Sequence, residues 1–88
     1  MPVTVVLPRS LVALLPGTER RCTVDGASVA EVIDRLDDRT PGLRSRLVDS
    51  GPTLREHINV FVDGVQGDLG TAVPDGATVH VIPAVSGG

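Results

Sequence analysis

Apolar and polar positions alternate in short β-branched segments at both ends of the chain, and apolar positions follow a helical spacing in the middle. Residues 3–7 are rich in valine and are followed by Pro8, which predicts a first strand. Residues 21–24 predict a second strand with Cys22 and Val24 on one face. Together the two segments predict an N-terminal hairpin.

The link between these two strands contains an apolar patch, Leu11 to Leu15, which is cut off by Pro16 and Gly17. The patch is too short to show a helical or a strand period, so we expect an irregular segment laid against the core. A docking patch is the alternative interpretation of the same side chains.

The clearest local signal is a capping box from Ser28 to Glu31, which predicts the start of a helix. In this motif the serine oxygen accepts a hydrogen bond from the Glu31 amide, and the glutamate reaches back to the Ser28 amide. Apolar residues then recur at helical spacing and form one stripe: Val29, Val32, Ile33 and Leu36. Thr40-Pro41-Gly42 ends this helix, and Thr40 as N-cap is also suited to open a short second helix carrying Leu43 and Leu47.

The C-terminal half predicts further strands joined by tight turns. Ile58 to Val62 is the strongest strand pattern of the chain, and the turn pair Asp63-Gly64 predicts a hairpin into Val65-Gln66. Pro74-Asp75-Gly76 predicts a second turn, because proline presets one φ angle and glycine accepts a positive one.

Thr78 to Ile82 predicts the last strand, since valines alternate there and Pro83 lacks the amide hydrogen needed for further pairing. The order of elements is therefore hairpin, helix, strand, turn, strand, with one amphipathic helix available to cover one face of the sheet. This order predicts an α+β two-layer sandwich. A chain of 88 residues holds one such domain with one modest core.

Composition and charge exclude several classes of function. The chain has a net charge of −3, from eleven Asp and Glu against eight Arg, and Phe61 is its single aromatic residue. Nucleic-acid binding needs a basic face and aromatic stacking platforms, so we expect no nucleic-acid partner. The apolar runs are too short to cross a membrane and lack the flanks of a signal peptide. We therefore expect no membrane association and a cytoplasmic location.

Side chains that often carry chemistry are few. Cys22 is the single cysteine, which excludes an internal disulfide and a cysteine-rich zinc site, and we expect it to pack in the core. His57 and His80 are too few and too far apart in sequence to predict a metal site, so no metal is expected. The glycines match neither a P-loop nor a dinucleotide-binding fingerprint, so nothing in this chain is expected to bind ATP. Three acidic residues are expected to form a solvated helix face: Asp34, Asp37 and Asp38.

The sequence after Pro83 reads Ala84-Val85-Ser86-Gly87-Gly88. Glycine has no Cβ, so a Gly-Gly end is able to pass through a narrow channel and leaves its carboxylate unhindered. If extended, these residues reach about 17 Å beyond the fold, far enough to enter another protein's active site. We therefore divide the chain into a globular domain, residues 1–83, and a flexible C-terminal tail, residues 84–88. An inert chain end or a remnant of cloning is the alternative interpretation.

These features together resemble the small ubiquitin-like sulfur carriers of the ThiS/MoaD family, most closely their CysO-like actinobacterial branch. The resemblance rests on the order of elements over nearly the whole chain and on three segments: Asn59 to Gly64, Asp75 to Val79, and Ile82 to Gly88. It implies a β-grasp (ubiquitin-like) fold of the α+β class, in which a mixed sheet packs on one main helix and the last strand projects the Gly-Gly tail.

The resemblance also implies a function for the tail. The Gly88 carboxylate is adenylated from Mg-ATP by a ThiF/MoeB-like enzyme and converted to a thiocarboxylate, while Gly87, Ser86 and Val85 thread into the partner. Activation is needed because an ionised carboxylate is a poor acyl electrophile. The sulfur then passes to a downstream synthase that is cysteine-synthase-like or thiosugar- or thiazole-synthase-like. ATP and Mg belong to the activating partner, so this chain is expected to bind no cofactor and to be a protein co-substrate, not an enzyme.

Two alternatives stay open. The first is a ubiquitin-like protein modifier joined through Gly88 to lysines of its targets. The chain has no lysine of its own, which prevents chain building but not attachment. The second is a passive interaction domain with an inert tail.

Overall fold

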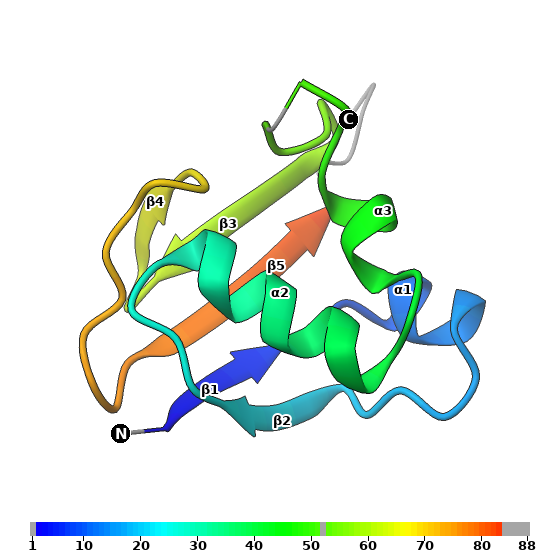
Figure 1. Ribbon diagram of the computed structural model, residues 1–88, viewed down its shortest axis with the longest axis horizontal. Coiled ribbons are helices and arrows are strands. Elements are labelled where there is room, and N and C mark those ends of the chain that lie inside the picture. Colours follow the sequence, from blue (N-terminus) through cyan, green and yellow to red (C-terminus); the bar gives the residue numbers. More distant parts are fainter. Residues whose placement is uncertain (1, 52, 84–88) are drawn as a thin grey trace.

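A five-stranded mixed sheet lies at the centre of the structure, a computed structural model that describes residues 2–51 and 53–83 (Figure 1). The elements follow one another in this order: β1 (Val3–Val6), α1 (Arg9–Leu14), β2 (Arg21–Val24), α2 (Val29–Arg39), α3 (Leu43–Leu47), β3 (Ile58–Val62), β4 (Val65–Gly67) and β5 (Thr78–Pro83). The strand order across the sheet is β2-β1-β5-β3-β4, so the last strand is the middle one.

Both predicted hairpins are present, and one parallel pair joins them. β1 pairs antiparallel with β2, and β3 pairs antiparallel with β4. β5 lies between the hairpins, parallel to β1 and antiparallel to β3. The predicted mixed sheet is therefore confirmed.

Two turns have the backbone that their sequences predict. Asp63 and Gly64 both have positive φ, 49° and 85°, which suits the right-handed twist of a two-residue hairpin. Gly76 has a φ of 78°, and the Ala77 amide closes this turn by donating to the Pro74 carbonyl at 3.1 Å. Short-range chemistry thus fixes both chain reversals.

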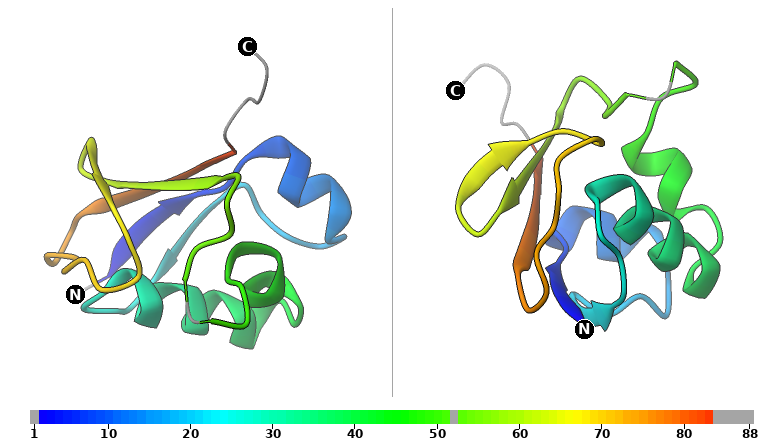
Figure 2. Two further views of the ribbon diagram at one scale, coloured as in Figure 1. Left: turned by 90° about the horizontal axis from the view of Figure 1, so that it is seen from above. Right: turned by 60° about the vertical axis from the view of Figure 1, so that its left-hand side comes forward.

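One face of the sheet is covered by α2, as the second view in Figure 2 shows. The apolar stripe predicted for this helix is buried throughout, and Ile33 is only 2% exposed. It packs against the inward valines of the sheet: Val3, Val5, Val60, Val62, Val79 and Val81. The prediction of a sheet packed on one main helix is confirmed, because the period-3.6 and period-2 apolar faces meet in one core.

The start of α2 differs in one detail from the predicted capping box. The Glu31 amide donates to the Ser28 oxygen at 3.3 Å, as expected, but the Glu31 carboxylate lies 3.5 Å from the Ser28 hydroxyl and not at its amide. The backbone on either side of Ser28 is committed to a bridge with Ala72, which sets the direction of the chain entering the helix.

The segment expected to be irregular between β1 and β2 is instead the helix α1. Its cap residue Pro8 supplies no side-chain hydrogen bond, but the Pro8 carbonyl accepts from the amides of Leu11 and Val12 at 3.1 and 3.2 Å. Leu11 is buried in the core. Tertiary packing therefore stabilises a helix too short to form by local propensity.

The predicted second short helix exists as α3, but its N-cap is Gly42 and not Thr40. The Thr40 amide still belongs to α2, since it donates to the Leu36 carbonyl at 2.9 Å. Asp37 from α2 caps the start of α3: its Oδ1 accepts from the amide of the N-cap Gly42 at 3.1 Å and from the Arg44 amide at 3.0 Å, while the Leu43 amide donates to the Thr40 carbonyl at 3.1 Å. A cap supplied by another helix leaves no trace in the local sequence.

Candidate functional site

The residues predicted to carry the chemistry, Val85, Ser86, Gly87 and Gly88, lie outside the described residues. The described part of the site is the strand from which they continue, β5, together with the surfaces around its end at Pro83. The predicted boundary between domain and tail, after Pro83, stays a prediction, because residues 84–88 lie outside the described residues.

β5 is paired on both sides in its first half and on the β3 side alone at its end. Thr4 to Val6 pair with Thr78 to His80 on one side, and β3 pairs with β5 along its whole length on the other. The last of these pairs joins Pro83 to Ile58. A segment that continues from Pro83 therefore starts from a fixed point on a rigid sheet.

The sheet face opposite α2 carries a row of partly exposed side chains. Val6, His80 and Phe61 stand side by side in the strand register, and Ile82 lies nearer the tail and is 45% exposed. In the left view of Figure 2 the described helices do not cover this face. One surface beside the end of β5 is therefore a mixed apolar and polar sheet face.

The other surface beside the end of β5 is a groove of about 590 Å³ between the end of the sheet, α1 and α3. The last pair of β3 and β5, Ile58 and Pro83, lines it. We call it the tail-base groove. Its apolar lining comprises Pro8, Leu11, Leu14, Leu15, Ile58 and Pro83. Its other lining residues are Ser10, Gly42, Ser45, Arg46 and Arg55.

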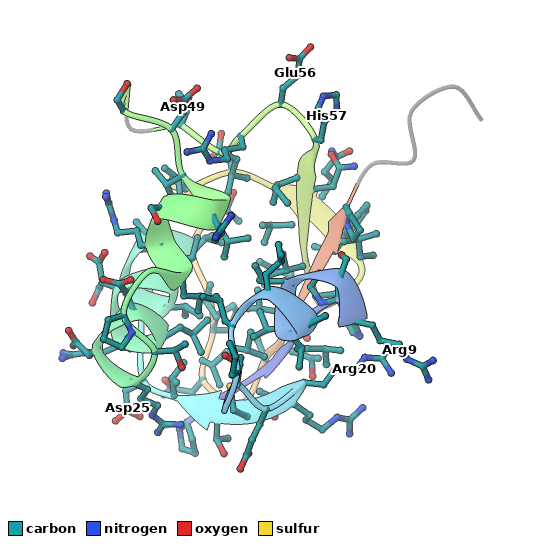
Figure 3. All side chains as sticks on the ribbon, turned by 90° about the vertical axis from the view of Figure 1, so that its right-hand side faces the viewer. Arg9, Arg20, Asp25, Asp49, Glu56 and His57 are labelled. Atoms are coloured by element: carbon teal, nitrogen blue, oxygen red, sulfur yellow. The ribbon has the colours of Figure 1, made fainter. Side chains whose placement is uncertain are left out.

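Hydrogen bonds from two segments, α2 and the loop before β3, hold the α3 wall of the groove in place. Asp37 caps α3 from α2, as described above. Arg55 ties the loop before β3 to the same helix: its Nε donates to the Ser45 carbonyl at 2.8 Å and its amide to the Leu47 carbonyl at 2.9 Å. In Figure 3, which looks onto this end of the molecule, Glu56 and His57 project from the loop before β3 away from the body.

Cys22 does not have the character of a nucleophile. It is partly buried against the core, and this burial raises the pKa of the Cys22 thiol, an effect that nearby Arg39 opposes and Glu19 reinforces. A thiol with a raised pKa has little thiolate near neutral pH. The expected packing role is therefore confirmed in part, since Cys22 borders the core without being fully enclosed.

The described residues offer no alternative centre for metal chemistry. Within residues 2–51 and 53–83, no three His, Cys, Asp or Glu side chains gather closely enough to hold a metal ion. His57 is exposed, and His80 lies on the sheet face opposite α2. None of the helices in this part of the chain has the length and apolarity needed to cross a membrane.

Sequence reasoning missed the tail-base groove. Its walls come from four separate segments of the chain, and α1 was not predicted as a helix. The one sequence signal for the groove is the apolar patch Leu11 to Leu15. Packing against the core was the expectation for this patch, and a docking surface was the alternative. In the structure the patch is divided: Leu11 is buried in the core, whereas Leu14 is 57% exposed at the groove.

Comparisons with known proteins agree with this architecture. The sulfur carrier protein CysO of Mycobacterium tuberculosis is 33% identical over 94 aligned residues that cover 100% of both chains. Small archaeal modifier protein 1 of Haloferax volcanii is 39% identical over 69 residues, covering 77% of this chain and 79% of the modifier. Among solved structures, a chain in the crystal structure of the Amycolatopsis orientalis BexX/CysO complex superposes with a TM-score of 0.87. The chain in that complex is 38% identical in sequence, and the match covers 98% of the present protein and 99% of the chain in the complex.

These relatives and the mixed sheet on one main helix confirm the β-grasp, ubiquitin-like fold. The profile described as the ThiS family matches residues 13–88, which include the last strand and the Gly-Gly tail. With that match and a full-length relative at 33% identity, the chain belongs to the ThiS family and is CysO-like within it.

Proposed function

We propose that this protein is a sulfur carrier whose sulfur is held on the Gly88 carboxyl group as a thiocarboxylate. The observation that carries the proposal is the full-length similarity to the CysO sulfur carrier of M. tuberculosis, in a chain whose central strand is followed, after three residues, by Gly87-Gly88. The fold holds the base of the tail, and the tail brings its last residue to a partner.

The chemistry takes place on one carboxyl group and proceeds in two steps. A carboxylate oxygen of Gly88 attacks the α-phosphorus of Mg-ATP bound by a ThiF/MoeB-like enzyme, and pyrophosphate leaves. Hydrosulfide then attacks the acyl carbon, the bond to AMP breaks and AMP leaves, and loss of the proton gives the thiocarboxylate. Adenylation is needed because the ionised carboxylate is resonance-stabilised and offers no leaving group.

The protein is a co-substrate in this scheme, and the partners supply the rest. ATP and magnesium are bound by the activating enzyme, and the chain itself holds no cofactor. A downstream synthase, cysteine-synthase-like or thiosugar- or thiazole-synthase-like, takes the sulfur. Residues 84–88 act as the tail, in which Val85, Ser86 and Gly87 thread into each partner.

The test is intact-protein mass spectrometry after incubation with the cognate adenylating enzyme, ATP and a sulfide source. We expect the full chain to gain the mass difference between sulfur and oxygen, located on the C-terminal peptide. The matched control is a chain that lacks only Gly88, which should gain nothing. An unchanged mass for the full chain, with an enzyme that is active on another carrier, would contradict the proposal.

A protein modifier joined through Gly88 to target lysines is the second candidate. The similarity to small archaeal modifier protein 1 of H. volcanii favours it. Adducts in which Gly88 is linked to a lysine of another protein, in cells or with purified components, would support this candidate. An inert tail, the third interpretation, predicts that deletion of Gly88 leaves the biosynthetic pathway unchanged.

A further inference from the structure

The tail-base groove is a local positive region on an acidic protein. The chain has eleven Asp and Glu and a net charge of −3, yet none of the described residues that line the groove is acidic. Two of the eight arginines, Arg46 and Arg55, line it. The groove is therefore suited to a carboxylate from outside the molecule.

The two arginines of the groove differ in what they already bind. Arg55 donates to the Ser45 carbonyl and so helps to hold the wall. The side chain of Arg46 is exposed and makes no hydrogen bond or ion pair within residues 2–51 and 53–83. Its neighbour Arg44, in contrast, is paired with Asp34 at 3.0 Å. Arg46 is thus a cation available to a partner at the edge of an apolar surface.

Leu14 adds an exposed apolar side chain to the groove beside the cation of Arg46. It lies on α1, lines the same groove and is 57% exposed, although Leu11 from the same helix is buried. A large aliphatic side chain held this far out gains burial only when another surface covers it. An acidic side chain beside an apolar side chain would satisfy Arg46 and Leu14 together.

The position of Pro83 favours an enzyme that acts on the tail as the occupant of the groove. Pro83 lines the groove and is also the residue from which the tail continues. Five residues reach about 17 Å when extended, so an enzyme that holds Gly88 in its active site must bring the rim of that site close to the groove. The rim of such an enzyme is therefore the first surface that the groove meets.

We propose that the tail-base groove docks the enzyme that activates the tail, through a carboxylate and an adjacent apolar side chain on the rim of that enzyme's active site. The inference rests on the proposed function. It assigns to Arg46 and Leu14 a role in recognition, separate from the chemistry at Gly88.

The experiment measures pyrophosphate release by the purified adenylating enzyme as a function of the concentration of the full-length carrier. For Arg46→Glu we expect KM to rise at least about tenfold with little change in kcat, because a docking contact formed equally before and during chemistry contributes uniform binding. Leu14→Ser should raise KM by about threefold or more. The KM of the unmodified carrier should also rise with salt, whereas that of Arg46→Glu should be nearly insensitive to it.

Matched controls separate the groove from general effects of charge and polarity. Arg35→Glu makes the same charge change at an exposed position of α2, and Val65→Ser makes a similar polarity change on β4, where Val65 is 70% exposed. In Figure 1, β4 and the pair α1 and α3 lie on opposite sides of the molecule. Both controls should stay within about twofold of the unmodified KM. Circular dichroism confirms folding of each variant, and Arg46→Gln replaces Arg46→Glu if the latter does not fold.

The outcomes distinguish failure of the proposed sulfur-carrier function from failure of the proposed docking site. If the unmodified carrier supports no pyrophosphate release, the proposed function fails before docking is tested. If it does, and the Arg46 and Leu14 variants keep an unchanged KM, the docking site is wrong. An effect of Ile82→Ser alone would assign docking to the opposite sheet face. A carrier that sediments as a dimer through the groove, or whose tail amide resonances shift on Arg46 substitution without enzyme, would identify another occupant and overturn the inference.

Discussion

Replacing Ile33 tests whether the packing of α2 on the sheet provides the main stability of the domain. Ile33 lies in the middle of the apolar stripe of α2, is 2% exposed and belongs to the buried core. Truncation to alanine removes Cγ1, Cγ2 and Cδ1 and leaves the rest of the helix surface unchanged. The effect therefore reports on one well-defined contact surface.

The magnitude follows from the burial of these carbon atoms. At about 0.8 kcal/mol for each buried methylene-sized group, the transfer of the three carbons accounts for about 2.4 kcal/mol. The cavity left behind adds to this because the valines of the sheet relax only in part, so we expect a total loss of about 2.5 to 4 kcal/mol for Ile33→Ala. Ile33→Val removes one carbon and should cost about 1 kcal/mol.

The assay is urea unfolding followed by far-ultraviolet circular dichroism, since the chain contains no Trp or Tyr for fluorescence. The midpoint should fall for Ile33→Ala while the slope m stays constant, because the amount of surface exposed on unfolding hardly changes. A loss of 3 kcal/mol corresponds to a decrease in Tm of roughly 15 °C in a domain of this size.

The control for this measurement is Arg35→Ala on the exposed face of the same helix. It should change the free energy of unfolding by less than about 0.5 kcal/mol. A loss below about 1 kcal/mol for Ile33→Ala would refute the reasoning, because a side chain enclosed as Ile33 is does not lose its packing at so small a cost.

Three further predictions concern the wall of the groove, the thiol and the tail. Asp37→Ala removes the carboxylate that accepts from two amides of α3 and should cost about 1 kcal/mol in urea unfolding. Because burial raises the pKa of the Cys22 thiol, its alkylation by iodoacetamide at pH 8 should be slower in the folded protein than in urea. Folding favours the neutral form of the Cys22 thiol. Its contribution to the free energy of unfolding is therefore fully present below the pKa of the thiol in the unfolded chain, and it is lost as the pH rises through the higher pKa of the thiol in the folded protein. Under the proposed function, Gly87→Val should block adenylation without changing Tm, because a β-branched side chain obstructs a narrow channel but lies beyond the core.

The contrary results are equally specific. An Asp37→Asn variant that is as destabilised as Asp37→Ala would show that capping by the side-chain oxygen is not the cause. Equal alkylation rates in the folded and unfolded protein would contradict the burial of Cys22. Normal turnover of Gly87→Val would argue against threading of the tail.

Local sequence signals were sufficient to predict the elements whose start or turn is fixed by neighbouring residues. The start of α2 follows from Ser28 capping the Glu31 amide, and the β3–β4 hairpin follows from a turn pair that accepts positive φ at both residues. Even here one detail differs from the predicted capping box, because the Glu31 carboxylate lies at the Ser28 hydroxyl and not at its amide. The helix α1 lacked such a signal, since its stability depends on burying Leu11.

The candidate site divides in the same way. The Gly-Gly end and its resemblance to sulfur carriers can be identified from the sequence, because the chemistry needs only a terminal carboxylate without bulky neighbours. The tail-base groove cannot, because its walls come from segments up to 75 residues apart, Pro8 and Pro83. No local pattern of residues encodes such a distance.

The amino-acid sequence by itself determined the strands, the main helix, its buried stripe and the residues of the tail, since each depends on the periodicity or the turn chemistry of neighbouring residues. Only the tertiary structure decided that the last strand lies in the middle of the sheet, between β1 and β3, and that α3 takes its cap from Asp37. These features arise from pairing and packing between distant segments, whose free energies depend on how the whole chain closes around one core.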